Sequence, residues 1–176
     1  MEVIKTHMSK QASYKKEPKK RVVLYNTPSA DPLFVKSTVG APHFFIQKNG
    51  LCYQFYEQEV ILNPMVYNDN NIYIALENLS MLYDLNGEKL NIFNQQYKGK
   101  YTEKPWKGFK YWDNYTDNQY LKLNELLKIF NIKSSVKQSL EYMPDIINFS
   151  GICFRANFSP LFYDVTPAFE IEKIYY

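Results

Sequence analysis

Histidine and cysteine, the residues most often used for metal binding and nucleophilic catalysis, are scarce in this chain. The 176 residues include two histidines, His7 and His43, and two cysteines, Cys52 and Cys153. A catalytic zinc site needs about three protein ligands, and these side chains show neither Cys-x-x-Cys nor His-Glu-x-x-His spacing. A serine or cysteine nucleophile is most often activated by a histidine base, and this chain has no spare histidine for that role. We therefore expect no cofactor, a packed or hydrogen-bonded His43, and a Cys153 that is a small buried hydrophobe.

A second chemically distinctive stretch, residues 97–115, alternates aromatic rings with lysines. Exposed aromatics beside cations are good anchors for protein partners and for sugar rings. The alternative is that the stretch packs back on its own sheet. Both readings stay open from the sequence. The candidate interaction surface consists of Trp106, Lys107, Phe109, Lys110, Tyr111 and Trp112.

Composition limits the class of protein and of partner. Hydrophobic residues make up 45% of the chain and aromatic residues 17%, which is typical of a globular domain. The N-terminus lacks the apolar core of a secretion signal, and no apolar run is long enough to span a membrane. We therefore expect neither secretion nor a membrane partner. The net charge of +3 is too small to predict nucleic acid as a partner.

Basic residues gather near the N-terminus. Residues 9–21 hold six of them and almost no apolar side chain, so we divide the chain into a basic arm, 1–20, and a folded domain, 21–176. The arm is either a solvated leader or a segment that becomes ordered on a partner subunit or an acidic surface.

Hydrophobic runs and turn signals predict several strands. Arg21–Tyr25 is a short apolar run that ends at a turn, and Ile72–Leu79 has the pattern of a central strand. The runs 43–47 and 51–56 flank Asn49-Gly50, which is a strong hairpin signal because both residues tolerate positive φ. Two further strands are expected near the C-terminus, at Ile146–Phe149 and Ile152–Phe154.

One helix is expected in the second half of the chain. Asn86-Gly87 predicts a turn, followed by a polar, aromatic-rich loop over Lys89–Tyr115. Thr116 and Gln119 have the spacing of a capping box, and apolar residues at helical spacing then predict a helix over Asp117–Phe130. Strands alternating with a packed helix indicate an α/β fold with a mixed central β-sheet flanked by helices.

Three segments carry a resemblance to a known family: Ala41–Gln54, Asn71–Asn78 and Tyr163–Phe169. They resemble the zinc-dependent N-acetylmuramoyl-L-alanine amidases, a family that also includes the peptidoglycan recognition proteins and some phage lysozymes. The resemblance implies the amidase fold. It also implies cleavage of the lactyl-amide bond of peptidoglycan, with zinc held by two histidines and an aspartate or cysteine.

The positions that carry this chemistry in the amidases hold other residues here. The first zinc histidine falls at Tyr25, and the second, ten residues before the ligand carboxylate, falls at Phe154. Asp164 is the one ligand that remains. The catalytic glutamate of one branch aligns with Ala75, and the cationic residue two positions before the ligand aligns with Phe162. The resemblance therefore assigns these five residues to a vestigial amidase site.

We accordingly expect from the sequence that the chain is not an enzyme but a pseudoenzyme. Its expected role is a structural or interaction component of a larger assembly, such as a phage tail, ring or baseplate, located in the virion or the host cytoplasm. The expected partners are other protein subunits. The alternatives are a module that binds peptidoglycan without hydrolysing it and an active cell-wall amidase. The first alternative is weakened because the family's substrate-groove motif is not recognisable in Leu62–Asn71.

Overall fold

The structure is a computed structural model that describes residues 3–6, 13–16, 18–38, 41–62, 70–130, 132 and 135–175. Part of the basic arm, namely 1–2, 7–12 and 17, and most of the expected groove segment, 63–69, lie outside these described residues. In chain order the elements are β1 (Ile4–Lys5), β2 (Ser13–Lys16), β3 (Arg21–Thr27), α1 (Pro32–Ser37), β4 (Phe44–Ile46), β5 (Cys52–Gln54), β6 (Val60–Ile61), β7 (Asn71–Glu77), β8 (Met81–Leu85), β9 (Glu88–Leu90), β10 (Tyr101–Trp106), β11 (Phe109–Asp113), α2 (Asp117–Leu127), η1 (Ile146–Asn148), β12 (Gly151–Phe154), η2 (Arg155–Asn157) and η3 (Ile171–Lys173).

A mixed six-stranded sheet forms the centre of the molecule, in the order β1-β5-β4-β7-β3-β12. Strands β4, β7, β3 and β12 run parallel to one another, and β5 runs antiparallel to β4. The strands of the middle are apolar on both faces, as expected when both faces are covered. This arrangement confirms the predicted α/β fold with a mixed central sheet, and it confirms the predicted hairpin at Asn49-Gly50.

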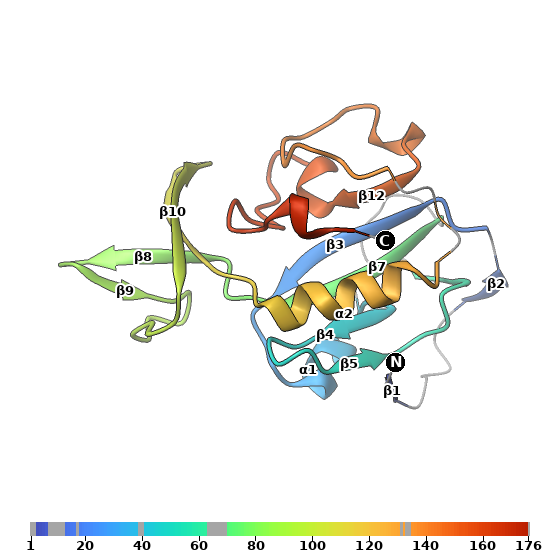
Figure 1. The fold of residues 1–176 in the computed structure, drawn as a ribbon, viewed down its shortest axis with the longest axis horizontal. Helices are drawn as coiled ribbons and strands as arrows, with labels where there is room; N and C mark the ends of the chain where they lie inside the picture. The colour runs from blue at the N-terminus through green and yellow to red at the C-terminus, as the bar shows by residue number, and fades with distance from the viewer. Residues whose placement is uncertain are drawn as a thin grey trace.

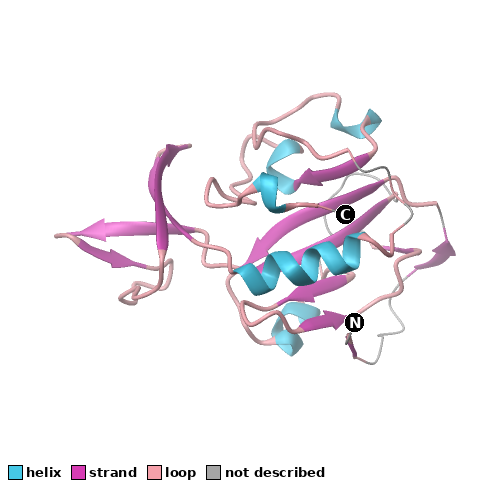
Figure 2. Ribbon diagram, viewed as in Figure 1, coloured by secondary structure: helices cyan, strands magenta, loops and turns pink. Residues whose placement is uncertain are grey.

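The two faces of the sheet pack against different layers. Helix α2 crosses one face (Figures 1 and 2) and closes the core that contains Leu24, Ile74, Leu123 and Phe154. On the other face Val35 of the short helix α1 packs with Tyr25 and its neighbours. Because side chains alternate along a strand, residues next to each other in β3 contribute to different layers.

Helix α2 begins where the sequence predicts. Thr116 accepts a hydrogen bond from the Gln119 backbone, and the Gln119 side chain accepts one from the Thr116 backbone, which completes the capping box. The helix ends at Leu127, three residues before the predicted Phe130. The last residues of the predicted span form turns instead.

A second sheet replaces the loop predicted for Lys89–Tyr115. Strands β8 to β11 form an antiparallel four-stranded sheet in the order β10-β11-β8-β9, which projects from the central domain (Figure 1). The tight turns at Asn86-Gly87 and Lys107-Gly108 have positive φ at both residues, the geometry that favours hairpins. The loop prediction was wrong because Pro105 and the closely spaced lysines obscure the alternation of β10.

Two other predictions need correction. Ile146–Phe149, predicted as a strand, contains the 3₁₀-helix η1, in which the carbonyls of Ile146 and Ile147 accept hydrogen bonds from the buried Arg21 guanidinium rather than from a neighbouring strand. Helix α1 was not predicted, although Asp31 caps it and Pro32 occupies its first position, which is a recognised start signal.

Two segments of the expected N-terminal arm take part in pairing. Strand β1 runs parallel to β5 at the edge of the central sheet, and β2 pairs with β6. Among the described residues, no helix is long and apolar enough to cross a membrane.

Candidate functional site

The candidate site lies where the parallel strands β3, β7 and β12 end. Their carboxyl ends meet at one edge of the sheet, because Thr27 is paired with Glu77 and Leu24 with Phe154. The chain that follows β12 then folds over this edge as η2 and the loop that leads to Asp164. In open α/β sheets, ligands bind outside the carboxyl ends of the strands.

An ion pair between Arg155 and Asp164 forms the centre of the site. Nε of Arg155 donates a hydrogen bond of 2.9 Å to Oδ1 of Asp164, and a terminal guanidinium nitrogen lies 2.8 Å from the same oxygen. The other carboxylate oxygen, Oδ2, accepts the backbone N–H of Asn26 at 3.0 Å. Both oxygens of Asp164 are therefore hydrogen-bonded, as a buried carboxylate requires.

The guanidinium is also held between two rings. It lies 5.3 Å from the ring centroid of Tyr25 and 4.9 Å from that of Phe162. These are distances at which a cation is attracted to an aromatic face. Arg155 thus connects three of the five residues that the sequence assigned to the site: Tyr25, Phe162 and Asp164.

A buried polar network adjoins the ion pair. The Asn26 side chain donates to Ser80 Oγ at 3.1 Å and accepts from the Tyr115 hydroxyl at 2.7 Å. The Tyr115 oxygen in turn accepts the backbone N–H of Thr166 at 3.2 Å. Oγ1 of Thr166 is buried and has no hydrogen-bond partner among the described residues. The network ties the ends of β3, β11 and the C-terminal segment together.

Burial and charge oppose one another at Asp164. The side chain is almost inaccessible, and this burial raises the pKa of the carboxyl, while the neighbouring Arg155 charge lowers it. Burial also raises the pKa of Tyr25 and of Tyr115 above the ordinary value of a phenol. Both phenols are therefore neutral at physiological pH and act as hydrogen-bonding groups.

The structure separates Phe154 from the other four residues of the predicted site. Ala75 pairs directly with Tyr25, and Tyr25, Ala75 and Phe162 belong to the same hydrophobic cluster. Phe154 pairs with Leu24 and points to the opposite face, where its ring lies 5.7 Å from that of Phe169. The physical reason is the period of the strand: positions paired with Leu24 and with Tyr25 alternate between faces.

Sequence reasoning missed Arg155, the residue that the other members of the site surround. A signal was present, because Arg155 is one of only two arginines in the chain and directly follows the strand that carries Phe154. Such a residue at the carboxyl end of a strand is well placed to pair with a carboxylate from the next loop. The role of Asn26 was also missed, because Asn26 was assigned to the turn expected after Arg21–Tyr25.

The histidine and cysteines of the described residues are buried and engaged in packing. His43 donates from Nε2 to the Val60 carbonyl at 2.9 Å and accepts the Tyr73 N–H at Nδ1, 3.0 Å away. Burial lowers the pKa of His43 to about 3. Cys52 and Cys153 are free thiols, and burial raises the pKa of each to about 12. The structure therefore confirms the expectations for His43 and Cys153.

These residues do not fit the zinc centre that the family resemblance implies. Within the described part of the chain, no three His, Cys, Asp or Glu side chains are grouped so that they could hold a metal ion. Asp164, the one matching ligand, is already paired with a guanidinium, whose positive charge opposes a second cation.

The candidate interaction surface is divided between core and solvent. Trp112, expected on this surface, is fully buried, and its Nε1 donates to the Lys104 carbonyl at 2.7 Å. Trp106 and Phe109 pack against the same core. Tyr111 is half-buried, whereas Lys110 is exposed and pairs with a carboxylate. Burial of Trp112 follows from its position on the face of β11 that meets the central domain.

The tip of the β10–β11 hairpin reaches the candidate site. Nζ of Lys107 donates to the carbonyls of Pro160 and Phe162, at 3.1 and 2.7 Å. The ring of Tyr163 makes edge-to-face contacts with Trp106 and Phe109. The hairpin therefore supports the loop that carries Phe162 and Asp164.

Solved structures of similar fold cover nearly the whole chain. The N-acetylmuramoyl-L-alanine amidase LysC from Clostridium intestinale URNW is 16% identical, with a TM-score of 0.58 over 99% of this chain and 95% of that protein. The endolysin amidase LysCS from the same organism is 16% identical, with a TM-score of 0.58 over 98% and 92%. The Se-Met derivative of AmpD is 15% identical, with a TM-score of 0.56 over 98% and 92%. No protein-family model and no curated protein sequence matches the chain.

The likeness establishes the amidase fold for this chain. It also contradicts the prediction that the chain is not an enzyme, because two of the proteins that share its fold over nearly the full length are described as amidases. Tyr25 and Phe154 stand where the amidases have their zinc histidines. This replacement was therefore insufficient ground for the prediction. The fold likeness does not itself identify catalytic residues.

Proposed function

We propose that this chain is a peptidoglycan-directed domain that binds its ligand at the carboxyl edge of the central sheet. The observation that carries the proposal is the amidase fold, shared along 98–99% of the chain with proteins that are described as amidases of N-acetylmuramoyl-L-alanine bonds. Peptidoglycan is the polymer that contains this bond.

The chemistry of the edge supports the choice of ligand. Arg155, whose side chain is 29% exposed, brings a guanidinium to this edge, next to the exposed loop that follows η2, while Asn26 and Tyr115 are buried beneath the surface and hold the edge in place. A glycopeptide presents hydroxyl and amide oxygens that a guanidinium can bind and apolar ring faces that stack on aromatic residues. Leu161, on the same loop, is 77% exposed and offers an apolar contact at this edge.

The experiment is co-sedimentation with purified peptidoglycan sacculi. Protein in the pellet is measured at increasing sacculus concentration, and soluble muropeptides are measured by mass spectrometry in the same tube. We expect the wild-type protein to pellet. Release of products cut at the lactyl-amide bond would mean that the protein hydrolyses peptidoglycan as well as binding it.

A matched pair of variants locates the binding surface. Leu161→Ser alters the loop at the carboxyl edge, whereas Leu121→Ser alters an exposed leucine of α2 that is 55% accessible. We expect Leu161→Ser to weaken pelleting several-fold and Leu121→Ser to leave it unchanged. Wild-type protein that stays in the supernatant at every sacculus concentration would contradict the proposal, and equal effects of both variants would contradict the location.

The projecting sheet favours a second candidate function, contact with another protein subunit. Its apolar side chains Tyr83, Leu85, Ile92 and Phe93 are between 38% and 58% exposed. Exposed apolar groups on a projecting element favour a protein interface. The hypothesis of a phage tail, ring or baseplate subunit is one form of such a contact. Sedimentation equilibrium of the wild type and of L85S/F93S tests the self-associating form, which predicts a smaller mass for the variant.

A further inference from the structure

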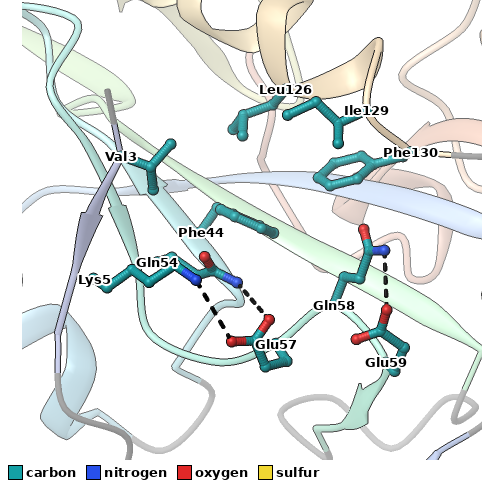
Figure 3. Close-up of a pocket in the computed structure, with 10 residues that line it drawn as sticks. All are labelled: Val3, Lys5, Phe44, Gln54, Glu57, Gln58, Glu59, Leu126, Ile129 and Phe130. Carbon is teal, nitrogen blue, oxygen red and sulfur yellow. Dashed lines mark hydrogen bonds and ion pairs between the residues drawn. The ribbon is translucent and has the colours of Figure 1, made fainter. Parts of the chain in front are cut away.

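A cavity of about 400 Å³ lies beside Phe44 at the amino end of β4, away from the candidate site (Figure 3). Its apolar side chains Phe44, Leu126 and Phe130 are already buried, so a ligand there would remove little further apolar surface from water. The carboxyl edge is covered by a loop instead, which is closed at its base where the Ala156 N–H donates to the Asp164 carbonyl at 2.6 Å. What a ligand meets at this edge depends on how the loop is held.

The middle of this loop, residues 159–163, is a tight turn that we call the apical turn. Ser159 Oγ accepts the Leu161 N–H at 3.2 Å, and the Ser159 carbonyl accepts the Phe162 N–H at 3.2 Å. The Leu161 side chain is 77% exposed, whereas the half-buried Phe162 ring lies 4.9 Å from the Arg155 guanidinium. The turn therefore presents a leucine to solvent and keeps a ring on the ion pair.

One side chain from outside the loop holds the apical turn. Nζ of Lys107 donates to the carbonyls of Pro160 and Phe162, which lie on either side of Leu161. Among the described residues, no other group outside the loop forms a hydrogen bond with the apical turn. Hydrogen bonds from an ammonium are stronger than those from a neutral donor. Lys107 therefore fixes the backbone on both sides of the exposed leucine.

The backbone of Lys107 supports a role for its side chain. Lys107 has a φ of 45° in the tight turn between β10 and β11, a conformation that Asn, Asp and Gly adopt more readily than lysine. The other tight turn of the same sheet has Asn86 in this position, with a φ of 54°. A residue kept in an unfavourable conformation indicates a contact that compensates for it. For Lys107 this contact is the one with the apical turn.

We propose that Lys107 is a positioning residue of the ligand site at the carboxyl edge. It holds the apical turn so that Leu161 faces the ligand and Phe162 stays on Arg155. The projecting sheet is then part of the site, because its hairpin determines the shape of the surface that the ligand meets. What the turn is positioned for rests on the function proposed above, whereas the hold of Lys107 on the turn does not.

The test compares Lys107→Asn with the wild type. Asparagine suits the backbone of this tight turn, so the hairpin should persist while the two hydrogen bonds to the apical turn are lost. We expect the backbone order parameters of Leu161 and Phe162, from ¹⁵N relaxation, to fall from about 0.85 to below about 0.6. We expect pelleting with sacculi to weaken about 5-fold, the result for a turn in the binding conformation about a fifth of the time.

Two further variants separate positioning from other effects. Lys107→Arg keeps the cationic donors and is expected to retain ordered Leu161 and Phe162 amides and near wild-type pelleting. Lys104→Asn removes an exposed lysine from the same hairpin and is expected to behave like the wild type in both measurements. A role of Lys107 in the tight turn alone would instead make Lys107→Asn equal to the wild type, because asparagine satisfies that turn.

Two results would overturn the proposal. The first is unchanged order parameters of Leu161 and Phe162 in Lys107→Asn. The second is a Lys107→Asn protein that pellets like a wild type that binds sacculi. Wild-type protein that does not pellet contradicts the proposed function instead, and the order parameters then decide whether Lys107 holds the apical turn.

Discussion

The hydrogen bonds of His43 predict that the free energy of unfolding decreases in mild acid. The ring is fully buried, and its Nδ1 accepts the backbone N–H of Tyr73. A backbone N–H can only donate, so Nδ1 must carry no proton and Nε2 must carry the one that is donated to Val60. A second proton on this ring would break the bond to Tyr73 and would place a charge in the core.

The magnitude follows from the two pKa values. Burial lowers the pKa of His43 from 6.5 to about 3, so the unfolded chain binds a proton here more tightly than the folded one. The stability is therefore fully present above pH 6.5 and is lost as the pH falls towards 3. At pH 5 the loss is about 2 kcal/mol, calculated from about 1.4 kcal/mol per pH unit.

The assay is urea unfolding of two proteins at pH 7.5 and pH 5. Both carry His7→Gln, so that His43 is the one imidazole left, and the second also carries His43→Gln. At pH 7.5 His43→Gln should be less stable by about 1–3 kcal/mol, because Tyr73 N–H loses its acceptor. Between pH 7.5 and pH 5 the protein with His43 should lose about 2 kcal/mol more than the variant.

Carboxylates titrate in both proteins, so the difference between them isolates the histidine. Equal losses in the two proteins would refute the reasoning, because they would mean that His43 has the same pKa folded and unfolded. If the protein with His43 loses less unfolding free energy than the variant between pH 7.5 and pH 5, the pKa of His43 is raised by folding rather than lowered.

Three further variants test other parts of the structure. Asp113→Asn should lower the free energy of unfolding by about 2–3 kcal/mol, because Asp113 is fully buried and pairs with Lys48. Amide exchange in β8 and β11 should become faster. Arg155→Ala should lower the unfolding free energy by about 3 kcal/mol at pH 7.5 and by less at pH 4, because protonation of Asp164 relieves the unpaired charge. Thr116→Ala should lower the melting temperature of the protein through the loss of about 1 kcal/mol of helix capping.

For each of these variants, one outcome would contradict the reasoning. An Asp113→Asn protein with wild-type exchange in β8 and β11 would mean that the ion pair does not hold the second sheet. R155A/D164N should recover part of the stability lost in Arg155→Ala, and a double variant no more stable than the single one would contradict the charge argument. An unchanged melting temperature for Thr116→Ala would mean that the capping box does not contribute to the stability of the protein.

The sequence predicted the parts of the fold whose signals are local. The strand at Ile72, the hairpin at Asn49-Gly50 and the start of α2 at Thr116 each depend on a few adjacent residues, and all three were confirmed. The projecting sheet was not predicted, because its strands are stabilised by partners far along the chain rather than by their own pattern. Tyr111, for example, pairs with Leu82, although β9 and β10 lie between them in the sequence.

The candidate site was predicted incompletely for a similar reason. The family alignment located Tyr25, Phe162 and Asp164, which the structure brings together. Alignment does not specify the face to which a strand residue points, so Phe154 was placed in the same group although it faces the other layer. The pairing of Arg155 with Asp164 depends on how the loop folds back, and no local pattern encodes that.

The two ends of the projecting sheet lie next to each other. The chain leaves the central domain after Asn78 and returns at Asp113, and the Asn78 side chain donates to the Asp113 carbonyl at 2.9 Å. Asp113 N–H also donates to the Ser80 carbonyl at 2.9 Å. A segment that departs and returns at one point can be lengthened, shortened or exchanged without rerouting the rest of the chain. The outer part of β8 and β9 can therefore change in length or sequence without disturbing the central sheet or the Arg155 pair.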